Sequence, residues 1–245
     1  MTLDDAFIAA DWSAPGGVVA GCTTRRGGVS GAAFRSLNLG DHVGDDAAAV
    51  SENRRRFVAA RGLPGEPRWL RQVHGADVIV EPVAGDEADA ALSRTAGVVC
   101  TVMVADCLPV LICSNDGREI AATHGGWRGL AAGVLENTVA AFDTLPGQLC
   151  AWLGPAISQR AFEVGDEVRR AFIGGNADAA ASFVRNDNGR WQADLFDLAR
   201  QRLNAVGVGN VSGGGLCTYS DPERFFSYRR DGQCGRMAAF IYRLP

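Results

Sequence analysis

Two apolar segments joined by a short turn constrain the fold most strongly. Residues 98–104 carry β-branched and apolar side chains on both faces of an expected strand, so this strand should be buried in the centre of a sheet. Residues 110–113 should continue it beyond the D-C-L-P segment at 106–109, where the proline interrupts the ladder. The N-D-G sequence at 115–117 predicts a hairpin. Residues 119–123 should therefore run antiparallel to the preceding strand, which argues against a purely parallel, doubly wound sheet.

Helical and strand patterns alternate along the rest of the chain. Acidic residues suit a helix N-terminus, and Asp45 and Asp46 open the first expected helix. No internal repeat or linker composition interrupts the pattern, so the sequence predicts one domain over residues 1–245, of the α+β class with a mixed sheet. The further expected elements are helices at 46–61, 130–145, 165–173 and 195–206, and strands at 18–23, 68–73, 76–81, 149–153 and 237–243.

Composition excludes several classes of protein. The formal net charge of -4 argues against a general nucleic-acid binder. The most apolar stretch, residues 97–113, is too short and too interrupted to cross a bilayer, so no membrane partner is expected. The seven cysteines are odd in number and form no C-x-x-C pair. An odd number of cysteines without a C-x-x-C pair fits a protein of the reducing cytoplasm better than a disulfide-linked protein.

Three side chains with metal-binding chemistry, His74, Cys107 and His124, lie in turn or small-residue contexts at the ends of expected strands. Two of the chain's three histidines belong to this trio. Two imidazoles and one thiolate are good zinc ligands that leave a fourth position open. The same residues could instead form a cysteine–histidine nucleophile system. Their spacings match no short metal-binding motif, so both hypotheses stay open at this point.

The residues after His124 add binding chemistry. Two glycines and the start of a helix follow, and free N–H groups at a helix start favour an anion. Trp127 offers a flat apolar face, and Arg128 offers a forked cation. This combination suits an aromatic base or an anionic group.

Further candidates lie near the other two members of the trio. Gln72 should share a strand face with His74, where it could orient the imidazole or contact substrate. Asp106 is the carboxylate nearest to Cys107 in sequence, although a regular strand would point it away from that thiol. His42, in a loop before a helix, could line the same pocket.

Seven segments of the chain have a distinctive composition: S-L-N-L-G-D-H-V-G-D-D (36–46), R-Q-V-H-G-A-D-V (71–78), A-D-C-L-P-V-L (105–111), H-G-G-W-R-G-L-A-A-G-V-L-E-N-T-V (124–139), W-L-G-P-A-I (152–157), F-E-V-G-D-E-V (162–168) and F-F-S-Y-R-R-D-G (225–232). Together, and in order from about residue 18 to residue 243, they resemble the YfiH family, also called the laccase-domain or multicopper polyphenol oxidase family. Two departures are Gly125, where the family has alanine, and Cys234, where it has threonine. Neither departure alters a candidate ligand.

The resemblance implies a single-domain α/β sandwich that is cytosolic and monomeric. It implies a metal site formed by His74, Cys107 and His124 and filled by zinc, and copper could occupy the same site. The implied activities are phosphorolysis of adenosine, inosine and methylthioadenosine to free base and ribose 1-phosphate, and hydrolytic deamination of adenosine to inosine. The expected partners are therefore a nucleoside and phosphate. Some members of the family are linked to editing of peptidoglycan precursors.

On the zinc hypothesis, zinc held by His74, Cys107 and His124 would supply a Lewis acid that makes water nucleophilic near neutral pH, which is the chemistry that deamination at C6 of adenine needs. Phosphorolysis needs a bound phosphate, which arginine forks suit. The candidate catalytic residues are Cys107, His124, Arg128 and Asp106, and the candidate substrate-binding residues are Asn38, His42, Gln72, Trp127, Arg229 and Arg230, with Arg54 behind them.

Three other functions remain open. Cys107 could act as a thiolate nucleophile with His124 or His74 as its base, which would make the protein an amide hydrolase, for example on a peptidoglycan precursor. A multicopper cluster needs more histidines than three, so any phenol oxidation would be a side reaction of copper in the zinc site. The protein could also be a binding module without turnover.

Overall fold

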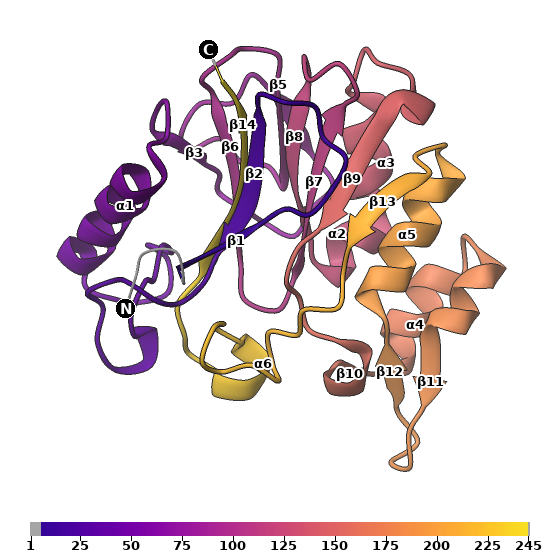
Figure 1. Cartoon of the computed structure of the whole chain (residues 1–245). Helices are drawn as coiled ribbons and strands as arrows, with labels where there is room; N and C mark the ends of the chain where they lie inside the picture. Colours follow the sequence, from indigo (N-terminus) through magenta and orange to yellow (C-terminus); the bar gives the residue numbers. More distant parts are fainter. Residues whose placement is uncertain (1–5, 245) are drawn as a thin grey trace.

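Two mixed β-sheets packed face to face form the centre of the computed structural model, which describes residues 6–244 (Figure 1). The five-stranded sheet has the order β1 (Phe7–Ala9), β2 (Val18–Thr23), β14 (Met237–Arg243), β6 (Val99–Val104), β3 (Pro67–Trp69). The six-stranded sheet has the order β13 (Asn210–Gly213), β9 (Leu149–Leu153), β7 (Leu108–Ser114), β8 (Ile120–Gly125), β5 (Ala90–Ser93), β4 (Val78–Val80). A small third sheet has the order β10 (Glu163–Val164), β12 (Trp191–Ala193), β11 (Phe183–Arg185).

Helices cover the two outer faces of this pair of sheets. Helix α1 (Ala47–Arg61) packs its Phe57 on the five-stranded sheet. The outer face of the six-stranded sheet is covered by α2 (Trp127–Ala132) and α3 (Val134–Ala140), and α5 (Leu195–Ala205) packs beside α3. Helix α4 (Asp166–Ile173) lies against the small third sheet (Figure 1). The remaining helical elements are α6 (Tyr228–Asp231) and the short turns η2 (Ala32–Phe34), η3 (Pro146–Gln148), η4 (Gln159–Ala161) and η5 (Ala177–Ser182). The result is a helix–sheet–sheet–helix sandwich.

The alternation of side chains along β14 shows how the layers arise from sequence. Ala239 and Ile241 face the core between the two sheets, whereas Phe240 and Tyr242 face the core under α1. Because successive strand residues point to opposite faces, a strand covered on both faces must be apolar throughout. The continuous apolar character of residues 98–104 has the same cause, and every residue of β6 is buried.

Most predicted elements are present. The strands expected at 18–23, 149–153 and 237–243 are found with those bounds. The predicted hairpin is also confirmed, because β7 and β8 pair antiparallel around the 115–117 turn. Helix α1 begins after Asp46, whose side chain accepts a hydrogen bond from the Ala49 N–H at 2.8 Å. The mixed α+β class is therefore confirmed.

Some boundaries were wrong, for local reasons. Residues 110–113 do not continue the strand at 98–104, because the chain crosses from one sheet to the other between β6 and β7, with Asp106 at a φ of +91°. Pro109 lies near the start of β7, a strand position that tolerates proline. The helix expected at 130–145 is instead α2 and α3, separated by Gly133 at a φ of +95°. The strand expected at 68–73 ends at Trp69.

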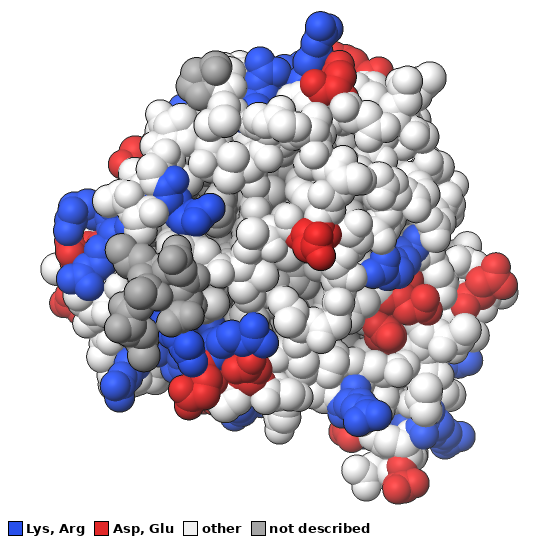
Figure 2. Space-filling model, in the orientation of Figure 1, with Lys and Arg blue, Asp and Glu red and all other residues white. Residues whose placement is uncertain are grey.

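The surface and helices add two observations about partners. Figure 2 shows arginine and acidic side chains interspersed over one face, most of them towards its margin, and the described residues visible there form no continuous basic surface. Within residues 6–244, no helix combines the length and hydropathy needed to cross a membrane.

Candidate metal centre

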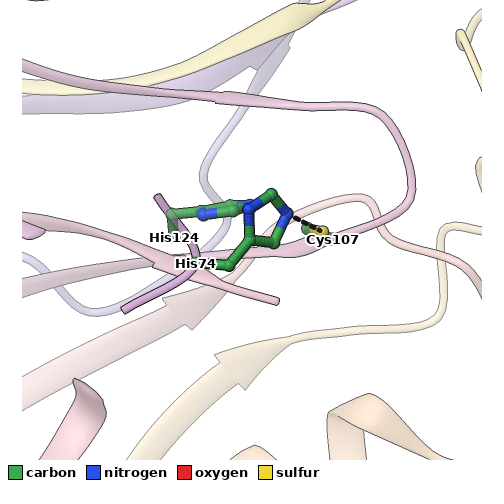
Figure 3. Close-up of side chains that lie close together, drawn as sticks. All are labelled: His74, Cys107 and His124. Carbon is green, nitrogen blue, oxygen red and sulfur yellow. Dashed lines mark hydrogen bonds between the residues drawn. The ribbon is translucent and has the colours of Figure 1, made fainter. Parts of the chain in front are cut away.

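The trio predicted from sequence comes together where the two sheets meet. His74 follows β3, Cys107 lies in the crossing between β6 and β7, and His124 is in β8. One ligand atom from each residue lies within 4.8 Å of the other two (Figure 3). The Cys107 Sγ is 3.9 Å from the His74 Nε2, and the two imidazole centroids are 4.7 Å apart. The geometry therefore allows one small ion to contact all three side chains.

Local backbone structure explains this convergence. β8 pairs with β7 so that Leu108 faces Gly125, which brings Cys107 next to the end of the strand that carries His124. His74 has a φ of +62°, an uncommon conformation for a residue with a Cβ atom. The surrounding hydrogen bonds must therefore hold His74 in place.

Asp89 supplies those hydrogen bonds and was missed by the sequence analysis. This buried carboxylate accepts main-chain N–H bonds from Val73 at 3.1 Å, His74 at 3.0 Å and Gly75 at 2.7 Å. It also accepts a bond from the His124 Nδ1 at 2.7 Å. One side chain thus fixes the loop of the first histidine and the ring of the second. The only sequence signal was an acidic residue just before an apolar strand.

Asp89 also determines which nitrogen of His124 is available. Because the carboxylate engages Nδ1, Nε2 is the free ring nitrogen. A carboxylate behind a metal-binding histidine is the usual way in which proteins orient the ring and raise its basicity. The donor set, two imidazoles and one thiolate with such a carboxylate behind one of them, fits zinc.

The electrostatics of the trio favour a bound cation. Burial opposes ionisation of the Cys107 thiol, but the adjacent His124 and His74 outweigh burial and lower the pKa of Cys107 to about 6. Burial also opposes a charge on His124, but the Cys107 thiolate and the Asp89 carboxylate raise the pKa of His124 to about 9. Without a metal, Cys107 and His124 are therefore a thiolate and an imidazolium at neutral pH. A metal that binds His124 must displace its proton.

Gly126 leaves the space that an ion needs. A Cβ atom at this position would lie 3.0 Å from the His74 Cδ2, 3.2 Å from the Cys107 Sγ and 3.5 Å from the His124 Cε1. Any larger residue would therefore fill the centre of the trio.

A cavity of about 380 Å³ opens beside the three ligands. Tyr228 and Arg236, from the C-terminal part of the chain, also line it, and neither was predicted as a site residue. The sequence signal that could have found them is the F-F-S-Y-R-R-D-G segment and the C-G-R that follows it. The lining residues are His42, Gln72, His74, Met103, Val104, Ala105, Cys107, His124, Tyr228 and Arg236.

Two predicted binding residues, His42 and Gln72, do line this cavity. The Gln72 amide donates to the Met103 carbonyl at 2.9 Å and accepts from the Met103 N–H at 2.7 Å, so it fastens the His74 loop to β6. His42 lies at the open side, next to Asp41. Trp127 and Arg128 begin α2 outside the cavity lining, with the guanidinium 4.5 Å from the indole centroid.

Asn38 and Asp106 lie away from the cavity lining and serve the fold. Asn38 is fully buried, and its amide makes hydrogen bonds with Gly40, Asp45 and the Arg236 N–H. Asp106 accepts bonds from the Thr218 hydroxyl at 2.6 Å and from the Arg229 N–H at 2.7 Å. Asp106 therefore points away from Cys107 and holds the C-terminal segment in place.

Arg229 and Arg230 are also outside the cavity lining, and their guanidinium groups have partners. Arg229 donates to the Glu163 carbonyl at 2.9 Å. Arg230 forms a 2.7 Å ion pair with Asp231 and donates to main-chain carbonyls, one of them the Phe225 carbonyl at 2.9 Å. Both arginines brace the C-terminal loop in this structure.

A sandwich that brings two histidines and a cysteine together beside a cavity defines a candidate metal-centred protein. Residues 19–244 match the family model described as multi-copper polyphenol oxidoreductase laccase, so the chain belongs to this family.

Similar proteins cover almost the whole chain. Purine nucleoside phosphorylase YfiH of Escherichia coli (strain K12) is 55% identical over 239 residues, which cover 96% of this chain and 98% of that protein. Purine nucleoside phosphorylase PA4543 of Pseudomonas aeruginosa is 53% identical over 240 residues, which cover 97% and 98%. The crystal structure of Neisseria meningitidis protein NMB0706 has a TM-score of 0.94 and 48% identity, and covers 98% of this chain and 100% of that one. The resemblance to the YfiH family is therefore confirmed.

Proposed function

We propose that this chain is a zinc-dependent purine nucleoside phosphorylase that acts on adenosine, inosine and methylthioadenosine. The observation that carries the proposal is the convergence of His74, Cys107 and His124 at the end of a cavity, with Asp89 behind them. The similarity to proteins named purine nucleoside phosphorylase supports the reaction class. We also propose that the same site deaminates adenosine to inosine.

The size of the cavity suits a nucleoside. Its volume of about 380 Å³ is within the range of roughly 300–1,000 Å³ that small-molecule sites occupy. A neighbouring cavity of about 550 Å³ shares His42, Gln72 and Met103 with it. A nucleoside with an enlarged 5′ group, such as methylthioadenosine, could extend into that second space.

Each residue of the site has a role on this proposal. Zinc, when bound, would supply a Lewis acid that activates water or polarises the purine. Asp89 holds His124 and the His74 loop in their binding positions. Tyr228 is exposed at the rim of the cavity, where its ring can cover a purine face.

Copper oxidation is a weaker proposal than nucleoside chemistry, despite the description of the family. Blue-copper and multicopper sites together need more imidazole ligands than this chain can supply with three histidines. A single copper ion in the zinc site would account for phenol oxidation as a side activity.

One observation favours a second candidate function, an amide hydrolase on a substrate such as a peptidoglycan precursor. On this proposal Cys107 is the nucleophile, His124 is its base, and Asp89 orients the His124 ring. Because the pKa of the Cys107 thiol is lowered to about 6, this residue is a thiolate at neutral pH. The same three residues thus suit a covalent mechanism when no metal is bound.

Metal analysis and a product assay separate these functions. We expect about one zinc per chain, and adenosine incubated with phosphate should yield adenine, while adenosine alone should yield inosine. Cys107→Ser should lose both the metal and the products, whereas Cys217→Ser, which alters a cysteine outside the cavity, should retain both. An active metal-free protein that forms a thioester at Cys107 would support the hydrolase instead.

We further propose that the protein acts as a monomer in the cytoplasm, with a nucleoside and phosphate as partners and without nucleic acid or membrane. All seven cysteines are free thiols in the structure, which suits a reducing compartment. The net charge of -4 argues against nucleic-acid binding. Sedimentation velocity should give a single species near the chain mass of 25.8 kDa.

A further inference from the structure

Phosphorolysis needs a site for a phosphate ion beside the nucleoside. The chain contains no lysine, so every basic side chain other than histidine is an arginine. Arginine binds phosphate through two parallel N–H donors, and this requires one edge of the guanidinium to be unoccupied. The position and remaining hydrogen-bond capacity of each arginine near the cavity therefore indicate where phosphate can bind.

Most arginines near the cavity have other partners. Arg230 is paired with Asp231 and donates to main-chain carbonyls. Arg229 donates to main-chain carbonyls away from the cavity. Arg54 lies in the neighbouring cavity, where it pairs with Asp41 at 3.2 Å. None of these three guanidinium groups lines the cavity of the trio.

Arg236 differs from these three arginines both in its position and in its remaining hydrogen-bond capacity. It lines the same cavity as the trio, and within residues 6–244 it is the only arginine that does so. Its Nη1 donates to the carbonyls of Cys234 at 2.9 Å and Gly235 at 3.1 Å. Its Nε and Nη2 make no hydrogen bond to a described residue, and no described carboxylate forms an ion pair with it. One edge of the fork is therefore anchored, and the other edge is unoccupied.

The backbone and stem of Arg236 are also fixed. Its N–H donates to the Asn38 side chain at 2.9 Å, and its carbonyl accepts from the Leu39 N–H at 3.1 Å. Gly40 makes room for the stem, because a Cβ atom there would lie 2.8 Å from the Arg236 Cγ. A preorganised donor loses less conformational entropy on binding than a mobile surface arginine.

The surroundings of Arg236 leave its charge available to a ligand. Burial and the charge of Arg236 hold the pKa of His42 below its usual range, so His42 is neutral at neutral pH. The Tyr228 ring lies 5.9 Å from the guanidinium carbon. No described aspartate or glutamate lines the cavity. Arg236 therefore supplies a fixed positive charge that no described aspartate or glutamate in the cavity lining neutralises.

We propose that Arg236 binds the phosphate ion that attacks the nucleoside in this cavity. In that reaction a phosphate oxygen forms a bond to C1′ while the C1′–N9 bond breaks. The purine leaves with the electron pair of that bond and takes the proton of the hydrogen phosphate, which gives free base and ribose 1-phosphate. This inference rests on the proposed phosphorylase function.

Steady-state kinetics with varied phosphate and saturating inosine test the proposal. Arg236→Gln removes the charge, Arg236→Lys keeps the charge without the fork, and Arg118→Gln alters an exposed arginine far from the cavity. We expect the KM for phosphate to rise roughly 10- to 100-fold in Arg236→Gln, as expected for a lost charge-assisted bond, and less in Arg236→Lys. Zinc content should stay close to wild type in all variants, and the KM for inosine should rise less than the KM for phosphate in Arg236→Gln. Arg118→Gln should leave these values and phosphate-independent deamination close to wild type. An unchanged KM for phosphate in a folded, zinc-loaded Arg236→Gln protein would overturn the proposal.

A binding assay separates this proposal from the proposed function. Inorganic phosphate should raise the melting temperature of the wild type and of Arg118→Gln, but not that of Arg236→Gln. If the wild type releases no base yet shows this pattern, the phosphorylase function fails and the phosphate site stands. If adenosine 5′-monophosphate stabilises the wild type while inorganic phosphate does not, the site takes a phosphate ester and the proposal is wrong.

Discussion

Replacing Asp89 by asparagine tests how one buried carboxylate organises the metal centre. Its Oδ2 accepts from Val73 and Gly75, and its Oδ1 accepts from His74 and His124, so each oxygen accepts two hydrogen bonds. The amide nitrogen of the new asparagine side chain would face two N–H donors whichever oxygen it replaced. At about 1.5 kcal/mol for each bond to a charged acceptor, the loss is about 3 kcal/mol.

This loss should appear in both stability and metal affinity. For a chain of this size, about 3 kcal/mol lowers the melting temperature by roughly 6–12 °C. Loss of the carboxylate behind a ligand weakens metal binding by roughly 10- to 100-fold. Calorimetric melting of the metal-free protein and a competition titration with a zinc chelator measure the two effects. Asp77→Asn, the same substitution at an exposed position, is the matched control and should change neither. Wild-type zinc affinity in Asp89→Asn would refute the orienting role of Asp89.

Three further predictions concern the thiol, the space between the ligands and the C-terminal brace. In metal-free protein, iodoacetamide should alkylate Cys107 with a half-maximal rate near pH 6, because the pKa of its thiol is lowered to about 6 and the thiolate is the reactive form. Mass spectrometry of the Cys107 peptide measures this rate, and a midpoint near pH 9 would contradict the prediction. Gly126→Ala should fold but bind zinc at least about tenfold more weakly, because the new methyl group enters the trio; an unchanged chelator titration would be inconsistent with this. Arg230→Ala should lower the free energy of unfolding in urea by about 2–3 kcal/mol, because its hydrogen bonds to main-chain carbonyls are lost, and should leave the KM for phosphate unchanged. A large rise in that KM would show that Arg230 binds phosphate.

The strands could be predicted from sequence where burial on both faces leaves a continuous apolar pattern. β14 and β9 have this pattern and were found with their observed bounds. β5 was missed because it has only four residues, Ala90–Ser93, of which three are small, and these show no distinctive periodicity. The crossing near Asp106 was missed because a change of sheet requires only a local turn, and composition does not distinguish that turn from an interruption within one strand.

The candidate metal ligands could be predicted because few residue types can bind zinc and this chain has only three histidines. The residues around them were harder to predict, because their roles depend on contacts between distant segments. Asp89 and Arg236 reach the site from opposite halves of the chain. Arg229 and Arg230 were predicted to bind substrate as forked cations, but in the structure their guanidinium groups donate to main-chain carbonyls outside the cavity lining. Hydrogen-bond capacity, rather than residue type, thus separates the arginines that brace the fold from the one that faces the cavity.

The X-ray absorption spectrum of the zinc-loaded protein reports directly which atoms bind the zinc ion. We expect a zinc environment with one sulfur and two imidazole nitrogens, supplied by Cys107, His74 and His124. The sulfur contribution should disappear in Cys107→Ser and persist in Cys217→Ser. A spectrum without sulfur, or one that is unchanged in Cys107→Ser, would show that Cys107 does not bind the zinc ion.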